Sequence, residues 1–178
     1  VNNITNWYKN NESIMLLYMP FEGGSNSTYT KDYSGNNNDG AVNSATWNQT
    51  GGKIGGGYEF DGSNDYIEIS NSLTFTNQIT IELWVKWKEF PEDVGGHAVL
   101  SKSNSATDGF MIYQSTGFPF NRLKVFLHNG TSDNSFQSGS RLNISKWYHV
   151  VLTSDGNSLK LYLNGTLDNE SSWKGNIS

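Results

Sequence analysis

Apolar residues recur at every second position through much of this chain, and this period of two decides what it can fold into. Between Ile79 and Trp87 every odd position is apolar, and the even positions are polar except for Trp84. The same alternation runs through residues 123–128, 148–153 and 158–163, with shorter stretches at 66–69 and 110–113. A period of two places one face of a β-strand against a core. Because we find no helical stripe, the sequence predicts an all-β chain.

The breaks between these stretches are typical of tight turns. An Asn or Asp followed by Gly occurs six times, and such pairs tolerate the positive backbone angles of hairpins. The pair Asp155-Gly156 separates residues 148–153 from 158–163, so these two strands should be antiparallel neighbours. Many short strands with one apolar face each predict a two-sheet antiparallel jelly-roll sandwich.

Length and composition limit the architecture further. The 178 residues suit one domain with a real core, which we place at residues 14–178. Residues 1–13 are polar and irregular, and we interpret them as an N-terminal arm or linker. The chain has no cysteine and no apolar run near the ~18 residues of a membrane helix. We therefore expect no disulfide, no thiol chemistry and no membrane span.

Charge and polar composition indicate where the chain acts. With 12 basic and 17 acidic residues the net charge is −5, which excludes a nucleic-acid binder that works by phosphate neutralisation. Asparagine is abundant, and the acceptor pattern Asn-x-Ser/Thr occurs nine times. These glycosylation candidates predict a secreted or cell-surface protein; they are Asn3, Asn11, Asn26, Asn48, Asn129, Asn143, Asn164, Asn169 and Asn176.

Seven short motifs occur in a fixed order: Leu-Tyr-Met-Pro-Phe-Glu-Gly (17–23), Asp-Tyr-Ser-Gly-Asn (32–36), Gly-Lys-Ile-Gly-Gly-Gly-Tyr-Glu-Phe-Asp-Gly (52–62), Glu-Leu-Trp-Val-Lys (82–86), Leu-Ser-Lys (100–102), Trp-Tyr-His-Val (147–150) and Leu-Tyr-Leu-Asn-Gly (161–165). Together they resemble the LamG-like jelly-roll family of the concanavalin A-like lectin/glucanase superfamily. The resemblance implies a concanavalin A-like sandwich that recognises glycans or protein partners through its loops. It also implies that Trp84 and Trp147 are framework residues that pack the core.

One feature departs from the resemblance. The family closes with a strand like Gly-x-Ile-Asp-Glu-Val, usually beside the first strand, and the sequence ends without it. The predicted first strand, from Leu16 to Phe21, would then be an open apolar edge, which proteins normally avoid. Either the natural chain continues past Ser178, or another chain supplies the strand and makes a homo-oligomer.

Catalytic residues are not evident, and we expect a non-enzyme. Glycoside hydrolysis needs two facing carboxylates, which the laminarinase-like branch carries as Glu-x-Asp-x-x-Glu. That motif is absent: Glu82 stands alone on its strand face, and Glu92 and Asp93 are loop neighbours. The chain also lacks a Gly-x-Ser-x-Gly elbow. The three histidines are scattered, and we interpret them as surface or packing residues: His97, His128 and His149.

Two loops offer oxygen ligands for a structural calcium ion, the one cofactor that we expect. Asp32, Asn36 and Asp39 cluster in the first, and Asp61 and Asp65 form the second. Carboxylate and amide oxygens are what calcium prefers, and members of the resembled family often hold calcium among such loops. The alternative is that these residues simply form turns.

Two functions fit these observations. The first is a non-catalytic, extracellular, N-glycosylated binding or adhesion module for glycan or protein partners. The second is a structural subunit of an extracellular filament or surface layer, assembled by strand donation between chains. Phe90 and residues 118–120, in loop-like sequence, are candidate exposed contacts.

Overall fold

A computed structural model places strands where the alternation predicts them. The structure describes residues 7–70, 73–74, 78–90, 97–103, 108–115, 121–129 and 133–174. Across these residues it contains strands and no helix, and therefore no helix long and apolar enough to cross a membrane. The chain divides into two compact units, Val1–Leu73 and Thr74–Ser178.

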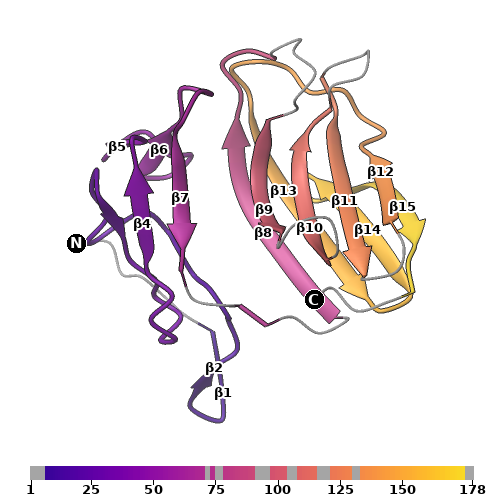
Figure 1. The fold of residues 1–178 in the computed structure, drawn as a ribbon, viewed down its shortest axis with the longest axis horizontal. Coiled ribbons are helices and arrows are strands. Elements are labelled where there is room, and N and C mark those ends of the chain that lie inside the picture. Colours follow the sequence, from indigo (N-terminus) through magenta and orange to yellow (C-terminus); the bar gives the residue numbers. More distant parts are fainter. Residues whose placement is uncertain are drawn as a thin grey trace. The chain divides into compact units, whose positions relative to one another are not determined.

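The second unit is a sandwich of two four-stranded antiparallel sheets (Figure 1). One sheet has the order β12-β11-β10-β9, with β9 at Ala98–Ser103, β10 at Asp108–Gln114, β11 at Leu123–Asn129 and β12 at Asp133–Gln137. The other has the order β15-β14-β13-β8, with β8 at Gln78–Lys86, β13 at Trp147–Asp155, β14 at Ser158–Leu163 and β15 at Thr166–Ser172. The expected pairing of residues 148–153 with 158–163 is confirmed, because β13 and β14 are antiparallel neighbours.

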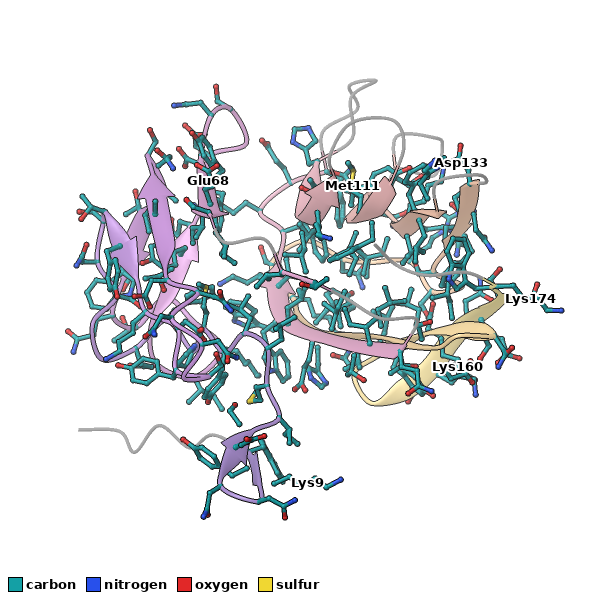
Figure 2. All side chains as sticks on the ribbon, turned by 60° about the horizontal axis from the view of Figure 1, so that its bottom comes forward. Lys9, Glu68, Met111, Asp133, Lys160 and Lys174 are labelled. Carbon is teal, nitrogen blue, oxygen red and sulfur yellow. The ribbon has the colours of Figure 1, made fainter. Side chains whose placement is uncertain are left out.

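The core lies between these two sheets. Alternate residues of each inner strand point inward, so that Ile112 and Leu161, from opposite sheets, are both fully buried. In Figure 2 side chains fill the space between the sheets, while Met111 and Lys160 lie on the outer sides. This is the one-apolar-face pattern that the alternation predicts. The buried cluster is Trp87, Phe110, Ile112, Leu123, Val125, Leu127, Leu142, Tyr148, Val150, Leu152, Leu159, Leu161, Leu163 and Trp173.

The first unit consists of short antiparallel pairs. A three-stranded sheet has the order β3-β4-β7, with β3 at Tyr29–Thr30, β4 at Gly40–Asn43 and β7 at Tyr66–Ile69. A second pair joins β5 (Thr46–Asn48) to β6 (Gly57–Glu59). Gly40 has to be glycine, because a Cβ there would come within 2.8 Å of side-chain carbons of both Thr30 and Ile67.

The predicted first strand, residues 16–21, is not a strand in the structure. Polar side chains take the backbone groups that a neighbouring strand would otherwise pair. The Tyr18 N–H donates to Asp32 at 2.9 Å, and the Leu16 carbonyl accepts the side-chain amides of Asn36 and Asn38 at 3.1 and 2.9 Å. Phe21 has a φ of +60°, which interrupts an extended backbone. In the structure this segment hydrogen-bonds to residues 32–38 of the same chain, and oligomerisation through it stays a prediction.

Residues 8–13, within the segment interpreted as an N-terminal arm or linker, have regular structure. They form a hairpin in which β1 (Tyr8–Lys9) pairs with β2 (Glu12–Ser13). The turn residues Asn10 and Asn11 both have positive φ, 53° and 68°. That pair of angles is the one a two-residue hairpin turn needs, and asparagine adopts it more readily than most residues.

Candidate functional site

A pocket of about 350 Å³ opens at one end of the sandwich in the second unit, and we call it the end pocket. The ends of β12, β13, β14 and β15 meet there, because β13 and β14 are antiparallel and joined to the other two by short connections. Its lining comes from the β12–β13 loop (Gly139, Ser140, Arg141, Asn143, Lys146), the beginning of β13 (Tyr148), and the β14–β15 hairpin, with Leu163 at the end of β14, Asn164 in the turn, and Thr166, Leu167 and Asp168 at the beginning of β15.

The loop side of the end pocket is fixed by a carboxylate from β15. Asp168 accepts the backbone N–H of Gly139 at 2.7 Å and that of Ser140 at 3.0 Å. The guanidinium of Arg122 donates to the carbonyls of Ser138 and Gly139. The loop is thus held through both its N–H and its C=O groups.

A β-bulge gives Asp168 this position. The register between β14 and β15 shifts, so that Tyr162 faces Leu167 while Leu161 faces Asn169. Asp168 is left without a partner residue on β14. A bulge of this kind re-aims a side chain and is common next to functional sites.

The opposite side of the end pocket is the turn that the Asn-Gly pair predicts. Asn164 and Gly165 have positive φ, 52° and 82°, as two-residue hairpin turns require. The side-chain oxygen of Asn164 accepts the His149 N–H at 3.0 Å, which fixes its amide at the rim. Tyr148 is buried, and its hydroxyl accepts the Asn143 N–H at 2.8 Å. Hydrogen bonds within the chain thus fix the backbone on both sides of the pocket.

Charged groups at the end pocket come from Arg141, Lys146 and Asp168. The Lys146 ammonium lies 5.4 Å from the Tyr148 ring centroid, and both cationic side chains are exposed. Sequence reasoning missed this site. Its one usable signal was the Asn-Gly turn, because the charged residues come from loops and a polar edge strand with no recognisable motif.

A second polar cluster lies on the outer face of β8 and β13. His149 stacks on Trp84 with ring centroids 4.9 Å apart, and its Nε2 lies 2.8 Å from a Glu82 oxygen. Trp84 is 46% exposed, so its interpretation as a core residue is wrong. Trp147 is half-buried on the same outer face, beneath the Lys86 ammonium. The tryptophans that pack the core are Trp87 and Trp173.

In the first predicted calcium loop, the carboxylate oxygens of Asp32 and Asp39 accept hydrogen bonds from within the chain. Asp32 is buried, and its two oxygens accept three backbone N–H groups and the Ser34 hydroxyl. Burial raises the pKa of Asp32, but the hydrogen bonds from Ser34, Tyr18 and Asn38 outweigh it and the net pKa is lowered. Asp39 accepts the Asp32 N–H at 2.8 Å.

In the second predicted calcium loop Asp61 is exposed and Asp65 is half-buried. Asp65 accepts the Asp61 N–H at 2.8 Å, and Asp61 accepts the Ser63 N–H at 2.8 Å. Within the described ranges the structure groups no three His, Asp or Glu side chains as a metal site. Calcium binding at either loop stays a prediction.

The predicted glycosylation sites differ in how their side-chain amides are placed. Asn11, Asn26, Asn48, Asn143 and Asn164 are exposed. Asn169 is half-buried, and its Nδ2 donates to the Gln137 carbonyl at 2.7 Å. Asn3, Asn176 and the side chain of Asn129 lie outside the described residues, as do Glu92, Asp93 and residues 118–120.

The comparisons with known proteins agree with this architecture. A family model described as "Concanavalin A-like lectin/glucanases superfamily" matches residues 61–178. Domain 4 of AbnA, a GH43 extracellular arabinanase from Geobacillus stearothermophilus solved with arabinotriose, is 17% identical; the match covers 82% of this chain and 71% of that one, with a TM-score of 0.68.

Two further solved structures share the fold. An S-layer domain-containing protein of Clostridium thermocellum is 23% identical over 89% of this chain and 73% of that one, with a TM-score of 0.54. A mutant of a protein named HCR/D is 16% identical over 91% of this chain and 41% of that one, with a TM-score of 0.66. No curated protein sequence matches the chain significantly.

Proposed function

Because this chain belongs to the concanavalin A-like lectin/glucanases superfamily, its fold is that of a carbohydrate-associated β-sandwich, and we propose that it is a non-catalytic module that binds carbohydrate in the end pocket. The fold alone does not assign a function. The observation that carries the proposal is a preorganised polar pocket whose one carboxylate is committed to backbone hydrogen bonds.

The lining suits a sugar. Hydroxyl and amide groups of Ser140, Asn143, Asn164 and Thr166 provide donors and acceptors for ring hydroxyls. Leu167 adds an apolar patch for the less polar edge of a ring. A volume of about 350 Å³ falls at the lower end of the roughly 300–1,000 Å³ of ligand pockets. The Asn164 side chain is already held by the His149 N–H, so it loses little freedom on binding, which favours affinity.

The same lining argues against hydrolysis. Cleavage of a glycosidic bond requires an acid and a second carboxylate on opposite sides of that bond. Asp168 is the one acidic residue among the lining residues, and both its oxygens accept backbone N–H groups. Glu82, the carboxylate considered in the sequence, is hydrogen-bonded to His149 on the outer sheet face.

The cellular setting belongs to the proposal as well. Exposed acceptor triplets such as Asn26 and Asn48 support export, N-glycosylation and a role in binding or adhesion at a cell surface. The alternative, a structural subunit of an extracellular filament or surface layer assembled by strand donation, stays a prediction; residues 16–21 already hydrogen-bond to side chains of residues 32–38 within the chain.

An NMR titration tests the proposal. The ¹⁵N-labelled chain is titrated with a panel of neutral and acidic oligosaccharides that includes arabinotriose. We expect amide shifts at Gly139, Ser140 and Asn164, and loss of these shifts in Thr166→Trp, which fills the pocket. Thr46→Trp, at an exposed position of β5, is the matched control and should bind normally. Binding that survives Thr166→Trp would overturn the assignment of the site.

A further inference from the structure

The charged groups of the end pocket differ in how many partners they have within the protein. Both carboxylate oxygens of Asp168, its acidic residue, accept hydrogen bonds from the backbone N–H groups of Gly139 and Ser140. In the part of the chain that the structure describes, neither Arg141 nor Lys146 forms an ion pair with a carboxylate. The pocket therefore presents two cationic groups beside a carboxylate that the protein has already partly satisfied.

The two cations are carried on a fixed frame. Arg141 follows Gly139 and Ser140, the residues that Asp168 holds, and precedes buried Leu142. Leu142 donates its N–H to the Asn121 carbonyl at 2.7 Å and accepts the Asn121 side-chain amide at 3.0 Å. Lys146 lies over the ring of buried Tyr148. The Arg141 backbone and the Lys146 ammonium are thus placed before any ligand arrives, as a binding site requires.

The net charge of the chain determines how an anionic ligand could bind at the end pocket. At a net charge of −5 the chain repels anions at long range. An anionic group would therefore bind through local contacts. A guanidinium matches a carboxylate with two parallel N–H bonds, and an ammonium adds a point charge.

We propose that the end pocket selects saccharides that carry a carboxylate, with Arg141 and Lys146 binding that group while Asn143, Asn164 and Thr166 contact the ring hydroxyls. This inference rests on the proposed carbohydrate-binding function and narrows it to acidic sugars. Charge-assisted hydrogen bonds of this kind correspond to about a ten- to hundredfold difference in Kd.

Calorimetry with matched ligands tests the inference. The probes are trigalacturonate and its methyl ester, which have the same ring hydroxyls and differ at the carboxylates, together with a sulfated oligosaccharide. The full chain is produced without glycosylation, so that Asn143 and Asn164 carry no glycan. The variant is Arg141→Gln/Lys146→Gln, and the control is Lys9→Gln/Lys124→Gln, which changes the net charge equally at positions outside the pocket.

We expect trigalacturonate to bind at least tenfold more tightly than its methyl ester, the pocket variant to lose that preference, and the control variant to keep it. Equal binding of acid and ester, unaffected by the pocket variant, would overturn the inference and leave the proposed function intact. Equal weakening by the control variant, or binding of the sulfated probe alone, would also overturn it. Absence of binding to every saccharide, with no shift at Gly139 or Asn164, would remove the proposed function as well.

Discussion

We expect the hydrogen bonds of the Asp32 carboxylate to stabilise the packing of residues 16–18 against residues 34–38. Replacing Asp32 with asparagine tests how much the carboxylate contributes. The side chain is 4% exposed, and its Oδ1 accepts the N–H groups of Tyr18 and Ser34 at 2.9 and 2.8 Å. Its Oδ2 accepts the Ser34 hydroxyl at 2.7 Å and the Asn38 N–H at 3.0 Å. An asparagine in the same rotamer keeps Oδ1 and turns an NH₂ group toward the Asn38 N–H.

The cost of Asp32→Asn follows from these bonds. One charge-assisted hydrogen bond is lost, and each such bond contributes about 1.5–3 kcal/mol. The Ser34 hydroxyl can rotate to accept from the new NH₂, while the Asn38 N–H is left facing a donor. The local free energy of opening should therefore fall by about 3 kcal/mol, which is about a hundredfold in the opening equilibrium.

Native-state hydrogen exchange measures this opening directly. We expect the amides of Tyr18, Ser34 and Asn38 to exchange about a hundredfold faster in Asp32→Asn at pH 7. Asp155→Asn is the matched control, because Asp155 also accepts turn N–H groups, from Asn157 and Ser158, and is exposed. Unchanged exchange at Tyr18 and Asn38 in Asp32→Asn would refute the reasoning.

The pH dependence gives a second test of the same group. The folded pKa of Asp32 is lowered, since its hydrogen bonds outweigh burial, so its contribution is present above the unfolded pKa of about 3.9. That contribution is lost as the pH falls through the folded pKa. After correction for intrinsic exchange, protection of Tyr18 should fall in acid in the wild type, and this acid loss should be absent in Asp32→Asn. An acid loss of equal size in the variant would assign the titration to another group.

Three further predictions concern the core, calcium and glycans. Leu161→Ala, in a side chain with 0% exposure, should lower the free energy of unfolding by about 2–5 kcal/mol in denaturant titrations, and a smaller loss would mean that the site collapses around the cavity. If Asp61, Asp65 or the Asp32 loop binds calcium in the folded chain only, saturating calcium at 100 times the Kd should add about 2.7 kcal/mol to stability; the same melting midpoint in calcium and in chelator would remove that prediction. Peptide mass spectrometry of native material should find glycans at Asn26 and Asn48, because both are exposed and each side-chain oxygen accepts the N–H and the hydroxyl of the Thr two residues later. It should find none at Asn169, because its Nδ2 already donates to the Gln137 carbonyl.

The strands that the sequence predicted well are those with one fully apolar face. β8, β13 and β14 carry uninterrupted alternation because their inner faces line the core, and the predicted ranges differ from the observed ones by at most two residues at either end. β12 and β15 escaped prediction because they are rich in Asp, Asn and Ser. An edge position alone does not weaken the alternation, since β8 also lies at the end of its sheet and alternates throughout.

The opposite error occurred at residues 16–21. An apolar run there predicted a strand, but the structure assigns none, and side chains from residues 32–38 hydrogen-bond to its backbone. The Asp, Ser and Asn residues that suggested calcium ligands donate and accept hydrogen bonds toward this segment. A sequence lists such residues without saying which partner they choose, because calcium, turns and a nearby backbone all use the same oxygens.

The end pocket escaped prediction for a related reason. One wall of the pocket lies at the β-bulge in β15. The bulge leaves Asp168 without a partner on β14, and Asp168 instead hydrogen-bonds to the β12–β13 loop. Local rules of alternation fail at such a point, and in natural proteins they fail most often where a site is built. A chain that restored the regular register of β15 would gain strand pairing and lose the carboxylate that fixes the loop carrying Arg141.

Deleting Asp168 should therefore be compared with Asp168→Asn. The deletion should abolish the preference for acidic saccharides along with loop protection, whereas Asp168→Asn keeps one acceptor and should reduce both only in part. Equal loss in the two variants would mean that the carboxylate, and not the bulge, controls the pocket.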